Sequence, residues 1–117
     1  MKYNYSEIKN VMELIKSNLT PDLLLPKHRE KNRNNPMYGH CVHASHALLL
    51  LIDTDRLVLM SGGNHMWVQD GEKIYDITCN QYSVLNLDPP YSKGKPHGNL
   101  KPSLRTLELV KRVQCAS

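Results

Sequence analysis

The stretch of sequence that decides the fold is CVHASHALLLLI, residues 41–52. It has good helix formers and no glycine or proline, so we predict a helix from Cys41 to Ile52. Its second half is apolar on nearly every side, which is typical of a helix that other elements cover all round. We therefore expect this helix to lie in the middle of the molecule, with the rest of the chain packed around it.

Downstream of this helix the sequence indicates three short strands. Leu57–Met60 is the first candidate, and the glycine-rich turn 61–64 separates it from the second, His65–Gln69. Asp70-Gly71 then leads into the third, Glu72–Ile77. An Asp-Gly pair between two β-rich runs is a strong signal for a two-residue hairpin turn. We therefore expect an antiparallel sheet directly after the central helix.

Helices are expected on both sides of this core. Ser6 is the predicted cap of a first helix that runs to Asn18, and its apolar stripe consists of Ile8, Val11, Met12 and Ile15. The remaining segments are a short helix at Asp22–Leu25, a loop at Lys27–Pro36, an irregular stretch at Gln81–Pro96, and a last helix that opens at Pro102-Ser103 and repeats Leu104, Leu107 and Val110. This order predicts an α+β fold with N-terminal helices, a central helix on a short antiparallel sheet, and a C-terminal helix, in a single domain spanning residues 1–117.

Composition narrows the class of protein. Hydrophobic residues make up 40% and charged residues 22% of the chain, as in ordinary globular proteins. The first ten residues, MKYNYSEIKN, lack the apolar stretch of a secretory signal, and no apolar run is long enough to span a membrane, so we expect a cytoplasmic protein without disulfides.

Of the three cysteines, Cys79 is expected to be a small buried residue and Cys115 to be exposed. The net charge is +4, but the basic runs do not alternate with aromatic residues, so no nucleic-acid partner is expected.

Three residues form a candidate catalytic triad. With Asp70-Gly71 as the turn, the hairpin register puts His65 opposite Asp76 on one face of the sheet. The carboxylate can then accept one imidazole N–H and leave the other ring nitrogen free. Cys41 lies in the first turn of the central helix, where the helix dipole and an imidazolium both favour a thiolate. A nucleophile, a base and an orienting acid are thereby assigned to Cys41, His65 and Asp76.

The residues expected to support this site are Gly39, Trp67, Thr78 and Gln81. Gly39 would allow a substrate backbone to approach closely, and Trp67 would shield the His–Asp pair from water. Thr78 is expected to be a core residue with local hydrogen bonds, whereas Gln81 either orients the site, donates to an oxyanion or caps a turn. The backbone N–H of Cys41 is one oxyanion donor, and the choice of a second one is open among Gln81, Asn34 and Asn35.

A metal site is the rival interpretation. Its possible ligands are His40, Cys41, His43, His46 and His65. The chain contains no Cys-x-x-Cys or His-Glu-x-x-His spacing, and adjacent residues on one helix point apart. We therefore expect neither a metal nor another cofactor, and we interpret His43 and His46 as helix residues whose hydrogen bonds are satisfied.

The motifs together resemble the YunG-like family of short bacterial and phage proteins. The shared pattern is Gly-x-Cys at a helix start, His-x-Trp on a strand, Asp-Gly, and Asp-x-Thr-x-x-Gln, and it stands here as Gly39-His40-Cys41, His65-Met66-Trp67, Asp70-Gly71 and Asp76-Ile77-Thr78-Cys79-Asn80-Gln81. The flanks Leu19-Thr20, Asp22-Leu23-Leu24 and Pro102-Ser103 are similar to those of phage members. The order Cys, His, Asp also resembles papain-like and transglutaminase-like enzymes, which implies a papain/transglutaminase-like core and the same roles for Cys41, His65 and Asp76.

These observations predict a thiol-dependent hydrolase or acyl transferase that acts on an amide, isopeptide or thioester bond. Its expected partner is a protein or peptide substrate, because the chain is short for a deep peptide cleft and favours a shallow site for a specific partner. The alternative is a non-catalytic binding protein, such as a phage factor that blocks a host or defence protein through its basic loops. If the chain is phage-encoded, its place of action is the host cytoplasm.

Overall fold

The computed structural model describes residues 2–98 and 101–116, and within them the chain forms helices and one antiparallel sheet. The helices are α1 (Ile8–Ser17), α2 (Pro26–Asn32), α3 (Cys41–Leu51), α4 (Asn80–Val84) and α5 (Leu104–Ala116). The strands are β1 (Val58–Gly62), β2 (His65–Asp70), β3 (Lys73–Tyr75) and β4 (Lys95–Pro96), in the sheet order β3-β2-β1-β4. Short 3-10 turns occur at Tyr5–Glu7, Pro21–Leu23 and Tyr91–Lys93. The predicted α+β class is confirmed.

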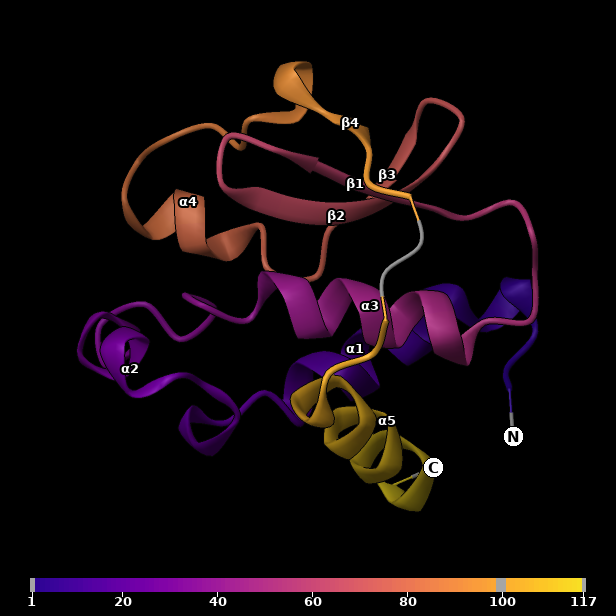
Figure 1. The fold of residues 1–117 in the computed structure, drawn as a ribbon, viewed down its shortest axis with the longest axis horizontal. Coiled ribbons are helices and arrows are strands. Elements are labelled where there is room, and N and C mark those ends of the chain that lie inside the picture. Colours follow the sequence, from indigo (N-terminus) through magenta and orange to yellow (C-terminus); the bar gives the residue numbers. More distant parts are fainter. Residues whose placement is uncertain (1, 99–100, 117) are drawn as a thin grey trace.

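The central position predicted for the apolar helix is also confirmed. The sheet covers one side of α3, and α1 and α5 cover the other (Figure 1). The buried residues of α3 follow one another without a gap through most of the helix: His43, Ala44, Ser45, His46, Ala47 and Leu48. The Ser45 hydroxyl donates a hydrogen bond of 3.0 Å to the carbonyl of Met66, which ties the helix to β2. None of the helices in the described residues is long and apolar enough to cross a membrane.

The apolar face of α1 was predicted correctly, whereas that of α5 was not. Ile8, Val11 and Ile15 are buried, but the predicted cap at Ser6 is wrong, because a 3-10 turn at Tyr5–Glu7 precedes the helix and no side chain caps it. The buried residues of α5 are Thr106, Leu109 and Val113. Its first predicted stripe residue, Leu104, is 85% exposed. The side of α5 that packs is determined by α1 and α3, which the spacing within α5 alone does not reveal.

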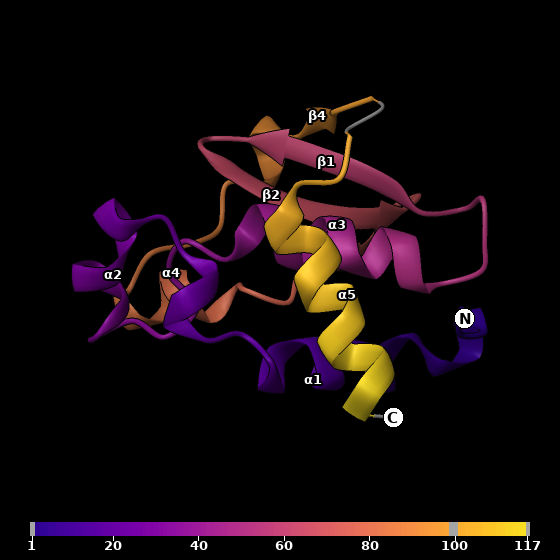
Figure 2. The same ribbon diagram turned by 60° about the horizontal axis from the view of Figure 1, so that its bottom comes forward.

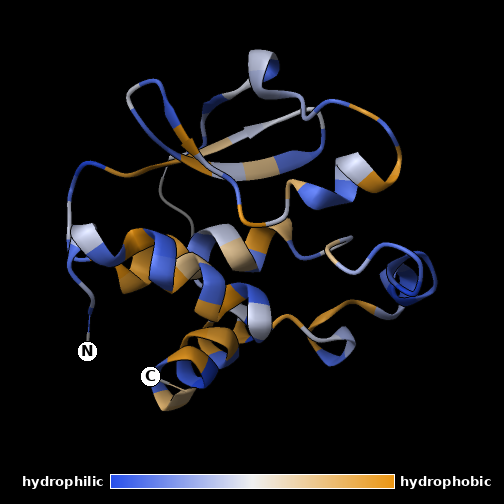
Figure 3. Cartoon of the chain, turned by 180° about the vertical axis from the view of Figure 1, so that it is seen from behind, coloured by the Kyte–Doolittle hydropathy of each residue, from blue (hydrophilic) through white to orange (hydrophobic). Residues whose placement is uncertain are grey.

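The segment predicted as the loop Lys27–Pro36 begins with a helix. Pro26 does not end a helix but occupies the first position of α2, where its fixed φ and missing N–H fit the helix. Residues 27–31 are good helix formers without apolar spacing, so no core-facing stripe indicated the helix. Figure 3 shows α2 as hydrophilic along its length, and α2 lies with α4 at the end of the molecule where α3 begins (Figure 2). The predicted short helix at Asp22–Leu25 is a 3-10 turn at Pro21–Leu23 instead.

The predicted register of the second hairpin is wrong by two residues. The turn residues are Gly71 and Glu72, and Val68 pairs with Tyr75. Asp70 stays in β2 because its carboxylate accepts hydrogen bonds of 2.6 Å from Tyr5 and from Arg56, while Gly71 supplies the positive φ of the turn. Because side chains alternate with a period of two, an even shift keeps every residue on its predicted face. The hairpin therefore still presents the His–Asp pair on one face.

Candidate active site

His65 and Asp76 form a buried pair. His65 is the first residue of β2, directly after the Gly63-Asn64 turn, and Asp76 is the first residue after β3. The Nε2 atom of His65 lies 2.7 Å from Oδ2 of Asp76, and the side chains are 0% and 2% exposed. The imidazole is thereby fixed in one orientation, and its Nδ1 atom is left for another partner.

The carboxylate of Asp76 is held on both oxygens. Tyr91 donates its hydroxyl proton to Oδ2 over 2.8 Å, and the backbone N–H of Thr78 donates to Oδ1 over 3.2 Å. A buried carboxylate needs such donors, because it loses its hydration. Burial, followed by the hydrogen bond and charge of Asp76, raises the pKa of Tyr91, so this hydroxyl stays protonated. Thr78, predicted to make local hydrogen bonds, therefore lies against the site.

Aromatic rings surround the imidazole. Trp67 is fully buried and stacks on His65 with ring centroids 5.7 Å apart and an interplanar angle of 28°. Tyr82 meets the same imidazole edge-on at 4.9 Å, and Tyr91 packs against Trp67 at 5.1 Å. Sequence reasoning anticipated the shielding by Trp67 but missed both tyrosines, because they lie in the segment 81–96, whose Pro- and Asn-rich composition shows no periodicity.

Cys41 is the first residue of α3, and its thiol is partly exposed. Burial alone would lower the pKa of His65, but hydrogen bonds to Asp76 and Cys41, and the charges of both, outweigh burial and raise it to about 9. Since Asp76 occupies Nε2, the nitrogen that faces Cys41 is Nδ1. The imidazole therefore lies between a carboxylate and a thiol, and it carries a proton at neutral pH.

Gln81, the first of the three proposed oxyanion donors, reaches the same imidazole. Its amide nitrogen lies 3.1 Å from Nδ1 of His65 and 3.3 Å from Oγ1 of Thr78. Asn35 is buried and donates a hydrogen bond of 2.8 Å to the backbone carbonyl of Gln81, so it supports α4. Asn34 is exposed and outside this network. Of the three candidates, Gln81 is the one whose side chain touches the triad.

Gly39 has a packing role. Its φ is +84°, and an added Cβ would lie 2.9 Å from Cδ2 of Leu24 and 3.1 Å from Cβ of His28. The loop in front of Cys41 is also held by Asn32, whose amide donates to the carbonyls of Pro36 and Tyr38 over 2.9 and 3.0 Å. These contacts fix the path by which the chain enters α3 and thus place Cys41.

Three more buried histidines lie at the start of α3 or within it: His40, directly before the helix, and His43 and His46 inside it. His40 and His43 are buried, with Nδ1 of His40 2.7 Å from Nε2 of His43. Burial lowers the pKa of His40 to about 4, and burial together with the charges of His40 and Arg105 lowers that of His43 to about 3. Nδ1 of buried His46 and Nε2 of His40 have no hydrogen-bond partner in the described residues, so the prediction of satisfied helix residues is wrong for His46. Within the same residues no group of three or more His, Cys, Asp or Glu side chains could hold a metal ion.

The other two cysteines differ from Cys41 in their surroundings. Cys115 is exposed, as predicted, and Cys79 is half-buried rather than buried. Burial, followed by the charge of Asp76, raises the pKa of Cys79. Exposed Cys115 is therefore the suitable internal reference for the reactivity of Cys41.

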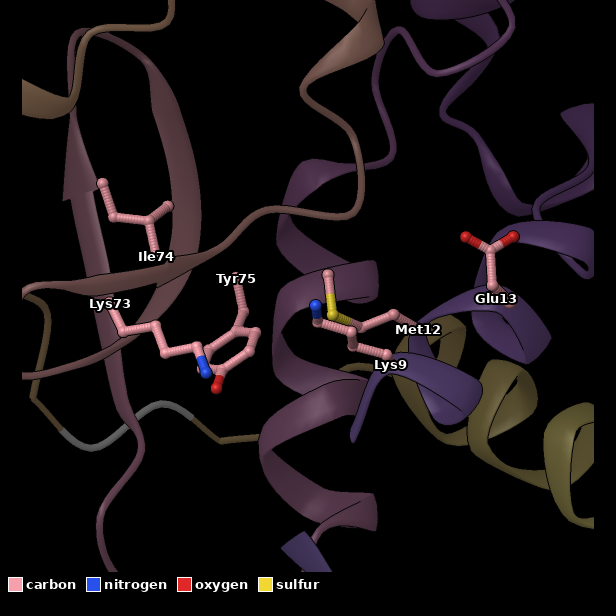
Figure 4. Close-up of a pocket in the computed structure, with 6 residues that line it drawn as sticks. All are labelled: Lys9, Met12, Glu13, Lys73, Ile74 and Tyr75. Carbon is pink, nitrogen blue, oxygen red and sulfur yellow. The ribbon is translucent and has the colours of Figure 1, made fainter. Parts of the chain in front are cut away.

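The thiol of Cys41 opens to a shallow surface hollow of about 440 Å³ between the start of α3 and the β1–β2 hairpin, with Ser61, Gly62 and Asn64 on its far side. A second hollow of about 390 Å³ lies between α1 and β3 (Figure 4). The lining of the second hollow is Lys9, Met12, Glu13, Lys73, Ile74 and Tyr75, without a cysteine or a histidine. A substrate can therefore reach the thiol from the surface, at a site without a deep cleft.

No family model, no curated protein and no solved structure matches the chain.

Proposed function

We propose that the protein is a thiol-dependent hydrolase or acyl transferase with Cys41 as nucleophile, His65 as base and Asp76 as orienting acid. The observation that carries this proposal is the position of His65, whose Nε2 is bound to a buried carboxylate while its Nδ1 faces a thiol at the start of a helix. Imidazolium charge and the N-terminal end of a helix both favour the thiolate, which is the reactive form of cysteine.

The geometry supports acyl transfer through a thioester. The thiolate of Cys41 attacks the acyl carbon of an amide, isopeptide or thioester, and an S–C bond forms. The proton on Nδ1 of His65 passes to the leaving amine or thiol as the bond to the acyl carbon breaks. Nδ1 then accepts a proton from water or from an amine, whose attack releases the acyl group and restores the thiolate. Asp76 keeps its hydrogen bond to Nε2 of His65 throughout.

Two N–H donors are available to the oxyanion. The first turn of α3 has no side-chain cap, and its backbone N–H groups, including that of Cys41, lack helical acceptors. The amide of Gln81 can donate to Nδ1 of His65 only while that nitrogen carries no proton. When the ring is an imidazolium, this N–H is released and can donate to an oxyanion beside Cys41. We assign Gln81 as the second donor.

The shallow hollow favours a specific protein or peptide partner over general proteolysis. The central helix on an antiparallel sheet, with the nucleophile at its first residue, supports a papain/transglutaminase-like core and the resemblance to the YunG-like family. On that resemblance we place the protein in the cytoplasm, and in the host cytoplasm if a phage encodes it.

The test is the rate at which iodoacetamide labels each cysteine between pH 6 and pH 9, measured by mass spectrometry on the intact chain. We expect Cys41 at pH 6 to react at least about ten-fold faster than Cys115, because an ordinary thiol is almost fully protonated there. The advantage should disappear in His65→Ala and persist in Cys79→Ser. If Cys41 instead follows the pH dependence of Cys115, the catalytic proposal fails and the non-catalytic binding protein becomes the better hypothesis.

A further inference from the structure

A third hollow, distinct from the one between α1 and β3, adjoins that of Cys41. Its volume is about 250 Å³, and Val42, the residue after the nucleophile, lines both hollows. This third hollow lies between residues 25–28 and the start of α5, where Ser103, directly before the helix, and Arg105 line it. It is smaller than the roughly 300–1,000 Å³ of sites for drug-sized ligands, so it suits one or two residues of a larger molecule.

The hollow carries an uncompensated positive charge. Arg105 is exposed, and it forms no ion pair with any residue in the described part of the chain. The acids on this side of the molecule, Asp22 and Glu108, lie 2.5 and 3.3 Å from nitrogens of Arg112 instead. Arg105 lines the hollow, and its charge contributes to the lowered pKa of His43, another lining residue. A guanidinium of this kind is suited to a carboxylate.

Apolar side chains line the hollow together with this charge. Val42 is 43% exposed and Leu25 is 39% exposed, and both line the hollow. Large apolar side chains left this exposed beside a reactive thiol provide contact area for a substrate. The hollow next to that of Cys41 therefore offers a bound chain both an apolar surface and a cation.

We propose that this hollow is a specificity subsite for an acidic peptide substrate, in which Arg105 binds a carboxylate and Val42 and Leu25 contact the apolar residue between that carboxylate and the reacting acyl group. The inference rests on the proposed function, because it assigns the substrate class of the Cys41 site. A peptide spans about 3.3–3.6 Å per extended residue, so a short probe is long enough to test it.

The experiment compares two alkylating peptides with amidated C-termini, N-iodoacetyl-Leu-Glu-NH2 and N-iodoacetyl-Leu-Gln-NH2, which differ in side-chain charge but not in shape. The second-order rate of Cys41 labelling is measured by mass spectrometry for the full chain, for Arg105→Gln and for Lys111→Gln. Lys111 is exposed on the same helix and outside the hollow, so its substitution makes the same charge change elsewhere. We expect the Glu peptide to react at least about five-fold faster than the Gln peptide, consistent with one charge-assisted contact. The ratio should fall to about one in Arg105→Gln and persist in Lys111→Gln.

A ratio near one in the unaltered protein, or a ratio that Arg105→Gln leaves unchanged, overturns the subsite. Iodoacetamide, which carries neither side chain, separates this failure from that of the proposed function. If iodoacetamide still labels Cys41 rapidly in a His65-dependent way while the peptide ratio is one, the catalytic proposal stands and the subsite falls. If iodoacetamide labels Cys41 no faster than Cys115, the catalytic proposal falls, and the subsite, now a carboxylate site beside an ordinary thiol, is judged by the same Glu-to-Gln ratio.

Discussion

At the scale of single residues, Asp76 connects β2, the turn before α4 and the segment around Tyr91. Its Oδ2 accepts from His65 and Tyr91, and its Oδ1 accepts from the backbone of Thr78. Each of these donors belongs to a different stretch of chain, so the orientation of the imidazole depends on all of them. If a buried carboxylate loses one hydrogen-bond donor, the free-energy cost of its lost hydration remains, but less of that cost is offset by hydrogen bonds.

Substituting Tyr91→Phe should therefore destabilise the protein by about 1–3 kcal/mol, the usual cost of leaving a buried polar group unsatisfied. The pKa of His65 should rise further, because the carboxylate would be less neutralised and would stabilise the imidazolium more strongly. Urea unfolding measures the first effect, and an NMR titration of the imidazole measures the second. Tyr82→Phe is the matched control, since the Tyr82 ring touches His65 without a hydrogen bond to Asp76. Equal effects of the two substitutions would show that the hydrogen bond from Tyr91 to Asp76 contributes nothing special, because both substitutions remove a hydroxyl and keep the ring.

At the scale of elements, the segment between α4 and β4 covers the site. It includes the 3-10 turn Tyr91–Lys93 and ends at Gly94, where an added Cβ would lie 2.4 Å from Cζ2 of Trp67. The φ of Gly94 is −69°, which any residue adopts, so the requirement for glycine at this position is purely steric. The approach of this segment to Trp67 is what brings Tyr91 to Asp76.

Gly94→Ala should push this segment away from Trp67, at a cost of about 1–3 kcal/mol, as for other overpacked sites. Trp67 is the only tryptophan in the sequence, so its fluorescence should shift to the red as the cover loosens and water approaches the indole. Ser92→Ala is the control, because it adds no atom at an exposed position of the same segment. An unchanged emission maximum in Gly94→Ala would contradict the close packing of the cover on Trp67.

The elements also differ in how far the sequence predicts them. The central helix was predictable because its apolar residues leave no polar face. The side of the sheet on which each hairpin residue lies was also predicted correctly, because the register error was two residues and an even shift does not exchange the two faces. The helix α2 was missed because it buries almost no side chain against the rest of the protein. Its sequence therefore has no apolar stripe that would indicate a helix. Cys41, His65 and Asp76 could be proposed from a helix start and a hairpin. Tyr91 could not, because its contact with Asp76 depends on the path of a non-periodic segment.

At the scale of the whole molecule, the buried histidines fall into two groups with opposite electrostatics. His40, directly before α3, and His43, within it, are buried, and burial lowers the pKa of each below its ordinary value of 6.5. Beside α3, His65 lies between a carboxylate and a thiol, and its pKa is raised to about 9. The folded state therefore resists protonation of the first group and favours protonation of the second.

These shifts predict that stability falls in both directions from a region near pH 6.5. Above pH 6.5 the unfolded state releases the proton of His65 while the folded state retains it. The stabilisation from this group, roughly 3 kcal/mol, is therefore complete below pH 6.5 and is lost as the pH rises through 9. Below pH 6.5 the unfolded state protonates His40 and His43 but the folded state does not, so a further loss of a few kcal/mol develops as the pH falls through about 4.

Urea unfolding at half-unit steps from pH 4 to pH 9.5 measures both arms of this profile, and two substitutions separate them. His65→Gln should flatten the profile between pH 6.5 and pH 9 and leave the acid arm in place, whereas His43→Gln should weaken the acid arm alone. If tyrosines or carboxylates also titrate, they would change the free energy of unfolding with pH in a way that neither substitution removes. If His65→Gln leaves the alkaline slope unchanged, His65 carries no extra proton in the folded state. The imidazolium on which the reactive thiolate of Cys41 depends would then be missing at neutral pH, so this stability measurement also tests the proposed chemistry without a substrate.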